Sequence, residues 1–217
     1  MIGTLRQAVT GFVRFAREVA ARPAREAVRS ISEAPLAAVS YPTEPLQLDP
    51  DPSFPDLRQF LQPGALVLDL GCGPGRNLPS LEEQGFRIVG VDQDPDVLGA
   101  VSATVPLLRA DLFELPLPDA SVDGVVAWQV LCQFPRSRAA VALAECHRVL
   151  KPDGLLVLSG CAGSGSFAGG GAEEALSHGL LTIPGKTFAP IETRVLPPAH
   201  GWHHARWLVL AAKLERV

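Results

Sequence analysis

The sequence of 217 residues lacks several features that would each assign it to a distinct class of protein. No two of its four cysteines form a C-x-x-C pair, which argues against a zinc site or a disulfide framework. No apolar run reaches the ~18 residues of a membrane-spanning helix, and no signal-peptide core follows the first residues. Positive charge is not in excess, since 23 acidic and 19 basic side chains leave a net charge of -4. The sequence therefore predicts a soluble, cytoplasmic protein without a metal, and argues against nucleic acid as a partner.

The sequence does contain enough apolar side chains for the core of one domain. A basic segment precedes that domain. Hydrophobic residues make up 47% of the chain and charged residues 19%, which is typical of a globular domain with a substantial core. Residues 1–34 hold six arginines against three glutamates, and Leu5, Val9 and Phe12 recur at helical spacing, which predicts a basic amphipathic helix. Three roles are open to it: a cap or lid on the domain, a helix in weak contact with a membrane surface, or a targeting segment.

A proline-rich segment separates this helix from the rest of the chain. Residues 35–55 carry six prolines, which neither a long helix nor a central strand tolerates, so we expect an extended arm or lid. Tyr41, the only tyrosine, lies in the arm, where contact with a ligand and simple packing are equally good interpretations. We therefore place the N-terminal helix and arm at residues 1–55 and the domain at residues 56–217.

From Ala65 onwards, short apolar segments alternate with helical ones. This alternation is typical of βαβ units, whose parallel strands are buried on both faces. Near the C-terminus two strand-like segments are joined by a PPAHG turn, which predicts an antiparallel hairpin at one sheet edge. The expected parallel strands are residues 65–70, 87–92, 106–111, 124–130 and 155–160, and the expected hairpin strands are residues 191–196 and 205–212.

A glycine-rich loop gives the strongest functional signal. In VLDLGCGPG, residues 67–75, an apolar strand leads into three glycines and then a helix, an arrangement that lets backbone approach a ligand closely. Helix N-terminal N–H groups beside such a loop favour a nucleotide-like ligand. A dinucleotide fingerprint requires G-x-G-x-x-G, whereas Arg76 stands at the third glycine position here.

An aspartate follows the next expected strand. Asp92 closes IVGVD, and a carboxylate at the end of a second strand can accept two hydrogen bonds from the hydroxyls of a ribose. Asp94 is better interpreted as the N-cap of a helix that begins at Pro95. The sequence thus predicts a nucleoside whose sugar lies next to Asp92.

The order of these features resembles the class I S-adenosylmethionine-dependent methyltransferases, whose first motif is an acidic residue followed by G-x-G-x-G. Asp69 and the loop match that motif, Asp92 matches the family's ribose-binding acid, and Asp111 matches its short acidic motif after the third strand. The small-molecule, methyltransferase type 11-like group is the most similar. The resemblance implies an α/β, Rossmann-like three-layer sandwich: a mostly parallel seven-stranded sheet with an antiparallel C-terminal edge hairpin, here with an N-terminal helical extension.

The same resemblance implies S-adenosyl-L-methionine as the cofactor and assigns residues to each part of it. The glycine loop packs against the methionine part, and the acidic residue before it orients the loop or the amino group. The aspartate after the second strand binds the ribose, and the segment after the third strand binds the adenine. The implied cofactor-binding residues are Asp69, Gly71, Cys72, Gly73, Asp92, Gln93, Asp111, Leu112 and Trp128.

The segment after the fourth expected strand lies where substrates meet cofactors in open α/β sheets. Trp128 and Gln129 belong to it and, with Tyr41, are the candidates for the substrate side, although buried packing explains Trp128 equally well. The segment lacks the Asp/Asn/Ser-Pro-Pro-aromatic pattern of enzymes that methylate base or glutamine amino groups. This absence favours a small-molecule acceptor.

The predicted function is transfer of a methyl group to a small molecule by in-line displacement, for which a general base is optional. Two other functions stay open. One is a non-catalytic regulator that binds S-adenosylmethionine, and the other is an NAD-dependent oxidoreductase, against which Arg76 counts. We expect the protein to be a monomer or a homodimer.

Overall fold

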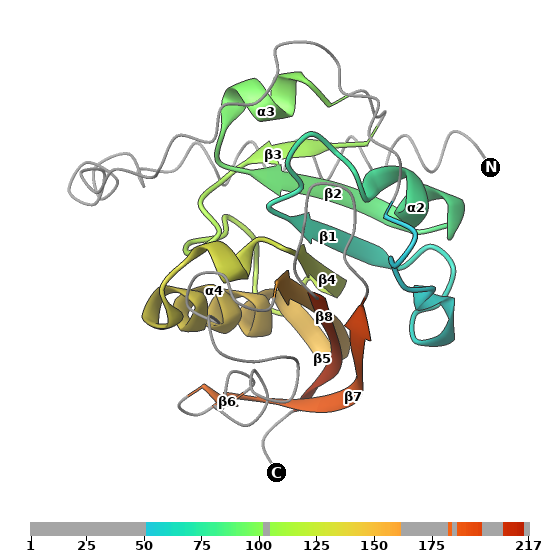
Figure 1. The fold of residues 1–217 in the computed structure, drawn as a ribbon, viewed down its shortest axis with the longest axis vertical. Coiled ribbons are helices and arrows are strands. Elements are labelled where there is room, and N and C mark those ends of the chain that lie inside the picture. Colours follow the sequence, from blue (N-terminus) through green and yellow to red (C-terminus); the bar gives the residue numbers. More distant parts are fainter. Residues whose placement is uncertain (1–50, 102–104, 162–181, 184–185, 197–205, 215–217) are drawn as a thin grey trace.

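The computed structural model describes residues 51–101, 105–161, 182–183, 186–196 and 206–214 (Figure 1). The predicted N-terminal helix, the arm as far as residue 50 with Tyr41, and the glycine-rich segment 163–171 lie outside the described residues. The described part holds the sheet, its helices and the predicted cofactor-binding residues.

An eight-stranded sheet forms the centre of the described residues, with strand order β3-β2-β1-β4-β5-β8-β7-β6. The first five strands pair in parallel, and the last three add antiparallel pairs, as the alternation of strands and helices and the C-terminal hairpin predicted. The fold class is therefore confirmed. The eighth strand is β6, whose two residues are too few to produce a periodic pattern in the sequence. The strands are β1 Leu66–Leu70, β2 Arg87–Asp92, β3 Leu107–Arg109, β4 Val122–Trp128, β5 Leu150–Cys161, β6 Thr182–Ile183, β7 Lys186–Leu196 and β8 Arg206–Leu214.

Helix α3 begins where the sequence predicts it. Asp94 caps α3, since its side chain accepts a hydrogen bond from the backbone N–H of Asp96 at 2.9 Å, and Pro95 opens the helix as expected. The longest described helix, α4, has 14 residues and covers one face of the sheet. The helices are η2 Leu57–Gln59, α2 Leu78–Glu83, α3 Pro95–Gly99, η3 Leu131–Gln133 and α4 Arg136–Val149.

Each face of the sheet packs against a separate apolar core, which makes the described part a three-layer sandwich (Figure 1). Alternate residues of β4 show the division: Val125 and Ala127 join the core that α4 covers, whereas Val126 and Trp128 join the core that α2 and η2 cover. Both faces of the central strands are therefore covered by apolar side chains, so we expect a ligand to bind at the strand ends.

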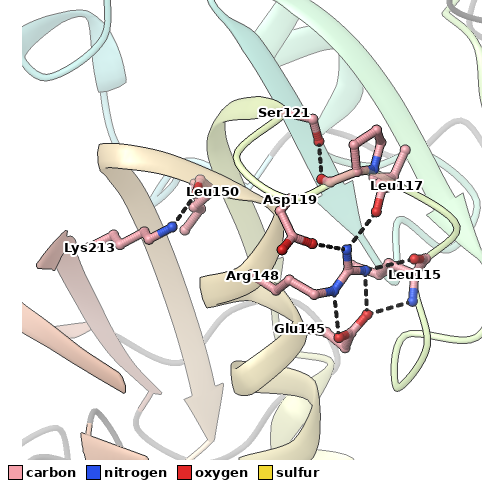
Figure 2. A network of polar contacts seen from close by, with 9 residues as sticks. Leu115, Leu117, Asp119, Ser121, Glu145, Arg148, Leu150 and Lys213 are labelled. Atoms are coloured by element: carbon pink, nitrogen blue, oxygen red, sulfur yellow. Dashed lines mark hydrogen bonds and ion pairs between the residues drawn. The ribbon is translucent and has the colours of Figure 1, made fainter. Parts of the chain in front are cut away.

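Polar contacts fasten the connection between β3 and β4 to α4 (Figure 2). The Arg148 guanidinium donates hydrogen bonds to the carbonyl oxygens of Leu115 and Leu117 and to the carboxylates of Glu145 and Asp119. Glu145 in turn accepts a hydrogen bond from the backbone N–H of Leu115 at 2.9 Å. The loop that follows the third strand is thus held by hydrogen bonds to its backbone, which do not depend on its own side chains.

Asp123 has a structural role near the start of β4. Its carboxylate accepts hydrogen bonds from the backbone N–H of Leu66 at 2.8 Å and from the Lys151 ammonium at 2.7 Å. Burial raises the pKa of Asp123, but these two donors outweigh it and hold the pKa below the usual 3.8. The residue ties β4 to the start of β1, at the opposite end of the strands from the glycine loop.

Candidate cofactor site

The glycine loop turns directly over the end of β2. Backbone N–H groups of Gly71 and Cys72 both donate to the carbonyl oxygen of Val91, at 2.7 and 2.9 Å, and Gly75 N–H donates to the carbonyl oxygen of Cys72 at 3.0 Å. Gly71, Gly73 and Gly75 have φ angles of 68°, 55° and 94°, a left-handed region that disfavours residues with a side chain. Burial raises the pKa of the Cys72 thiol, which keeps it neutral.

Gly71 and Gly73 differ in what surrounds them, and this difference is testable. A Cβ on Gly71 would lie 2.4 Å from a methyl carbon of Val130, whereas a Cβ on Gly73 would meet nothing within 4 Å. Both alanine substitutions carry the left-handed penalty of about 1–2 kcal/mol, but only Gly71→Ala adds an overpacking cost of about 1–3 kcal/mol. We expect urea unfolding to show Gly71→Ala as the less stable variant by that difference. Equal stabilities would contradict the packing described for Val130.

Asp69 lies beneath the loop, with only 1% of its surface exposed. Neither carboxylate oxygen has a regular hydrogen-bond partner among the described residues. Burial raises the pKa of Asp69 to about 7, the amide of Asn77 lowers it in part, and the charge of Asp92 raises it further. A buried carboxylate with so little hydrogen bonding is unfavourable as an anion, and a cationic ligand would relieve the cost.

Asp92 joins the glycine loop to the end of β2. One carboxylate oxygen accepts a hydrogen bond from Gly73 N–H at 3.1 Å, and the other accepts one from Asp94 N–H at 3.0 Å. Each oxygen keeps a further lone pair for a ligand hydroxyl, because a carboxylate offers about four acceptor positions. The side chain is half-buried and the neighbouring Gln93 is exposed, so this end of β2 is open to solvent.

The predicted adenine-binding residues lie at the same sheet edge. Asp92 pairs with Arg109 in the parallel register of β2 and β3, so Asp111 and Leu112 follow just beyond that point. Asp111 is exposed, and its carboxylate accepts a hydrogen bond from Phe113 N–H at 2.8 Å. Leu112 is buried in the core that α4 covers. The structure thus places Asp69, the glycine loop, Asp92 and Asp111 along one edge.

Trp128, at the end of β4, packs under the final residues of the arm. Its ring lies 5.0 Å from that of Phe54, and its indole N–H donates to the Asp51 carboxylate at 3.3 Å. Trp128 therefore has the buried packing role that is one of its two interpretations from the sequence. A contact of Trp128 with a ligand, the other interpretation, stays a prediction. Gln129 follows at the same edge, half-buried, whereas Tyr41 lies outside the described residues.

An ion pair next to Trp128 is one feature that the sequence does not predict. Arg206, at the start of β8 and 1% exposed, pairs with the buried Asp51 and donates to the hydroxyl of Ser53 at 3.0 Å. Burial raises the pKa of Asp51, but Arg206, Ser53 N–H and Trp128 together hold it below 3.8. The one signal for this pair is an arginine directly before the apolar run WLVLAA.

Comparisons with known proteins match this part of the chain to methyltransferases. Residues 68–158 match the family described as a methyltransferase domain. A probable S-adenosylmethionine-dependent methyltransferase of Mycolicibacterium smegmatis is 38% identical over 99 residues, which are 44% of this chain and 38% of that protein. An uncharacterized methyltransferase of Mycobacterium tuberculosis is 38% identical over 113 residues, 49% of this chain and 45% of that protein. The chain spans less than half the length of these curated relatives.

Solved structures show the same fold. A S-adenosylmethionine-dependent methyltransferase from Methanosarcina mazei superposes with a TM-score of 0.62 at 20% identity, covering 78% of this chain and 100% of that one. The 1,6-didemethyltoxoflavin-N1-methyltransferase of Burkholderia thailandensis, solved with bound 1,6-didemethyltoxoflavin and S-adenosylhomocysteine, gives a TM-score of 0.56 at 24% identity, covering 73% of this chain and 75% of that one. Residues 68–158 thus match a methyltransferase-domain family, and the described residues have the fold of S-adenosylmethionine-dependent methyltransferases.

Proposed function

We propose that the protein binds S-adenosylmethionine along the carboxyl edge of its sheet and transfers the methyl group to a small molecule. The observation that carries the proposal is the set of groups at that edge. Asp69 presents a buried carboxylate with no regular hydrogen-bond partner among the described residues, Gly73 has open space above it, and Asp92 keeps free acceptor positions. An ammonium group, the chain of an amino-acid tail and a ribose diol would, in that order, satisfy these three features.

The charge of the edge supports a cationic ligand. Asp69, Asp92 and Asp111 contribute carboxylates, whereas S-adenosylmethionine carries an ammonium, a sulfonium and one carboxylate. Three acidic groups at one edge create a negative potential that favours a net positive ligand. The same groups would bind a dinucleotide less well, because its pyrophosphate is anionic.

Bound S-adenosylmethionine supplies an electrophilic methyl group, so the protein's own task is alignment and exclusion of water. Asp92 would fix the sugar, and Asp111 and Leu112 would fix the base. The rigid glycine loop, held by the Val91 carbonyl, would fix the amino-acid tail. Orientation of this kind lowers the activation barrier by up to about 7–11 kcal/mol. It does not require a general base.

A small molecule is the acceptor that the residues favour. The net charge of -4 does not attract a polyanion, and the segment after β4 lacks the pattern of enzymes that methylate base amino groups. Among the proteins of the same fold, the Burkholderia thailandensis enzyme has the small molecule 1,6-didemethyltoxoflavin bound.

The direct test is a calorimetric titration with S-adenosylmethionine. We expect saturable binding that Asp92→Asn weakens by about tenfold to a hundredfold, because hydrogen bonds to a charged group contribute about 1.5–3 kcal/mol. Asp96→Asn is the matched control, since Asp96 is exposed in the first turn of α3 and should leave the affinity unchanged. If Asp92→Asn binds S-adenosylmethionine as tightly as wild type, the assignment of Asp92 to the ribose hydroxyls is wrong.

Two further measurements separate the alternatives. An NAD-dependent oxidoreductase would bind NAD and not S-adenosylhomocysteine, the reverse of our expectation. A non-catalytic binding protein would take up the cofactor without turnover. Release of S-adenosylhomocysteine from a methyl-labelled donor, in a screen of metabolites, would establish an enzyme and identify its acceptor.

A further inference from the structure

Gln129, directly after β4, has an unusual backbone conformation. Its φ of 59° lies in the left-handed region, which few residues other than glycine adopt. Its N–H donates to both the carbonyl and the hydroxyl oxygen of Ser159, each at 3.1 Å, and its carbonyl accepts from the Gln133 amide at 2.9 Å. Neighbouring groups thus hold the residue in a strained conformation, and strain of this kind is concentrated at functional sites.

The side-chain amide of Gln129 is also unusual. Its nitrogen is buried and has no hydrogen-bond acceptor among the described residues. Buried donors are almost always paired in folded proteins, because an unpaired donor loses its bonds to water. An oxygen atom of a bound ligand would supply the missing acceptor.

Gln129 lies next to the glycine loop. Asp69 pairs with Val126 in the register of β1 and β4, so the chain leaves both strands at the same edge. The next residue, Val130, is the side chain that a Cβ on Gly71 would meet at 2.4 Å. Two buried polar groups without regular partners among the described residues therefore lie at the sheet edge that carries the glycine loop. They are the Asp69 carboxylate and the Gln129 amide nitrogen.

These two groups are complementary to an α-amino acid. A carboxylate accepts hydrogen bonds from an ammonium, and an amide N–H₂ donates to a carboxylate. We propose that the Gln129 amide binds the carboxylate of the cofactor's amino-acid tail and that Ser159 is the positioning residue that holds Gln129 in place. This inference rests on the proposed function and extends it, because it assigns Gln129 to the cofactor and not to the methyl acceptor.

The test compares two ligands that differ in the tail. S-adenosylhomocysteine carries the amino acid, whereas 5′-methylthioadenosine has the same adenosine and sulfur without it. We expect Gln129→Met and Gln129→Glu to weaken S-adenosylhomocysteine about tenfold to a hundredfold and to leave 5′-methylthioadenosine within about twofold of wild type. Ser159→Ala should also weaken S-adenosylhomocysteine relative to 5′-methylthioadenosine, by a smaller factor. Gln59→Glu, at an exposed glutamine of η2, should change neither affinity.

Thermal unfolding distinguishes binding from a structural role. Because the amide nitrogen has no acceptor among the described residues, Gln129→Met should unfold at no lower temperature than wild type. A parallel loss of both ligands, or unchanged affinity for both, would overturn the inference while leaving the proposed function intact. Binding of neither ligand by the wild-type protein would overturn both.

Discussion

Asp69→Asn is expected to stabilise the free protein in alkaline solution while weakening cofactor binding. The folded protein holds the pKa of Asp69 at about 7, against 3.8 for an ordinary aspartate. Because the folded pKa is raised, the stability that this group contributes is present below about pH 4 and is lost as pH rises through about 7. Asparagine does not ionise, so the variant escapes that loss. Between about pH 5 and pH 8 we expect wild type to lose about 3 kcal/mol more than the variant.

Urea unfolding at the two pH values measures this difference. Asp123→Asn is a control of opposite sign, because the folded pKa of Asp123 is lowered and its contribution disappears as pH falls. Asp69→Asn should also bind S-adenosylmethionine at least about tenfold more weakly, because it loses the charged partner of the ammonium. A variant that is equally destabilised at both pH values would show that the Asp69 carboxylate has donors that the structure does not reveal.

The second large effect is expected at the buried ion pair between the arm and β8. Asp51→Asn removes the Asp51 carboxylate from the Arg206 guanidinium, which is 1% exposed. Breaking a buried pair from one side costs about 3–5 kcal/mol, because the remaining charge is uncompensated. We expect this loss in the free energy of unfolding, together with a change in fluorescence, since Trp128 donates to the same carboxylate.

The double variant Asp51→Asn with Arg206→Met is the informative control. Removing both charges should restore much of the lost stability, because the desolvation cost disappears along with the attraction. If the single variant loses less than about 1 kcal/mol, the pair behaves as a surface ion pair, and residues 51–54 are not fixed on the domain as described.

The parts of the molecule that the sequence predicts are those with local causes. Apolar strands that alternate with helices predict the five parallel strands, and Asp94 before Pro95 predicts the start of α3. The glycine spacing predicts the loop because left-handed backbone requires glycine there. Asp92 and Asp111 follow strands that the register places side by side, so their position at one edge could also be predicted.

The features that the sequence does not predict depend on contacts between distant residues. Asp51 and Arg206 are separated by 155 positions, and no periodicity relates them. The left-handed conformation of Gln129 depends on Ser159 in another strand, and the clamp of Arg148 on the loop after β3 depends on backbone oxygens that have no sequence signature (Figure 2). Long-range polar contacts of this kind become visible only once the fold brings the partners together.

The most direct measurement is a crystal structure of the protein with S-adenosylhomocysteine. The account predicts an adenosine along the carboxyl edge of β1, β2 and β3, with the ribose hydroxyls on the Asp92 carboxylate and the amino-acid tail over Gly71 and Gly73. An adenosine bound elsewhere, or a groove closed by side chains at that edge, would contradict it.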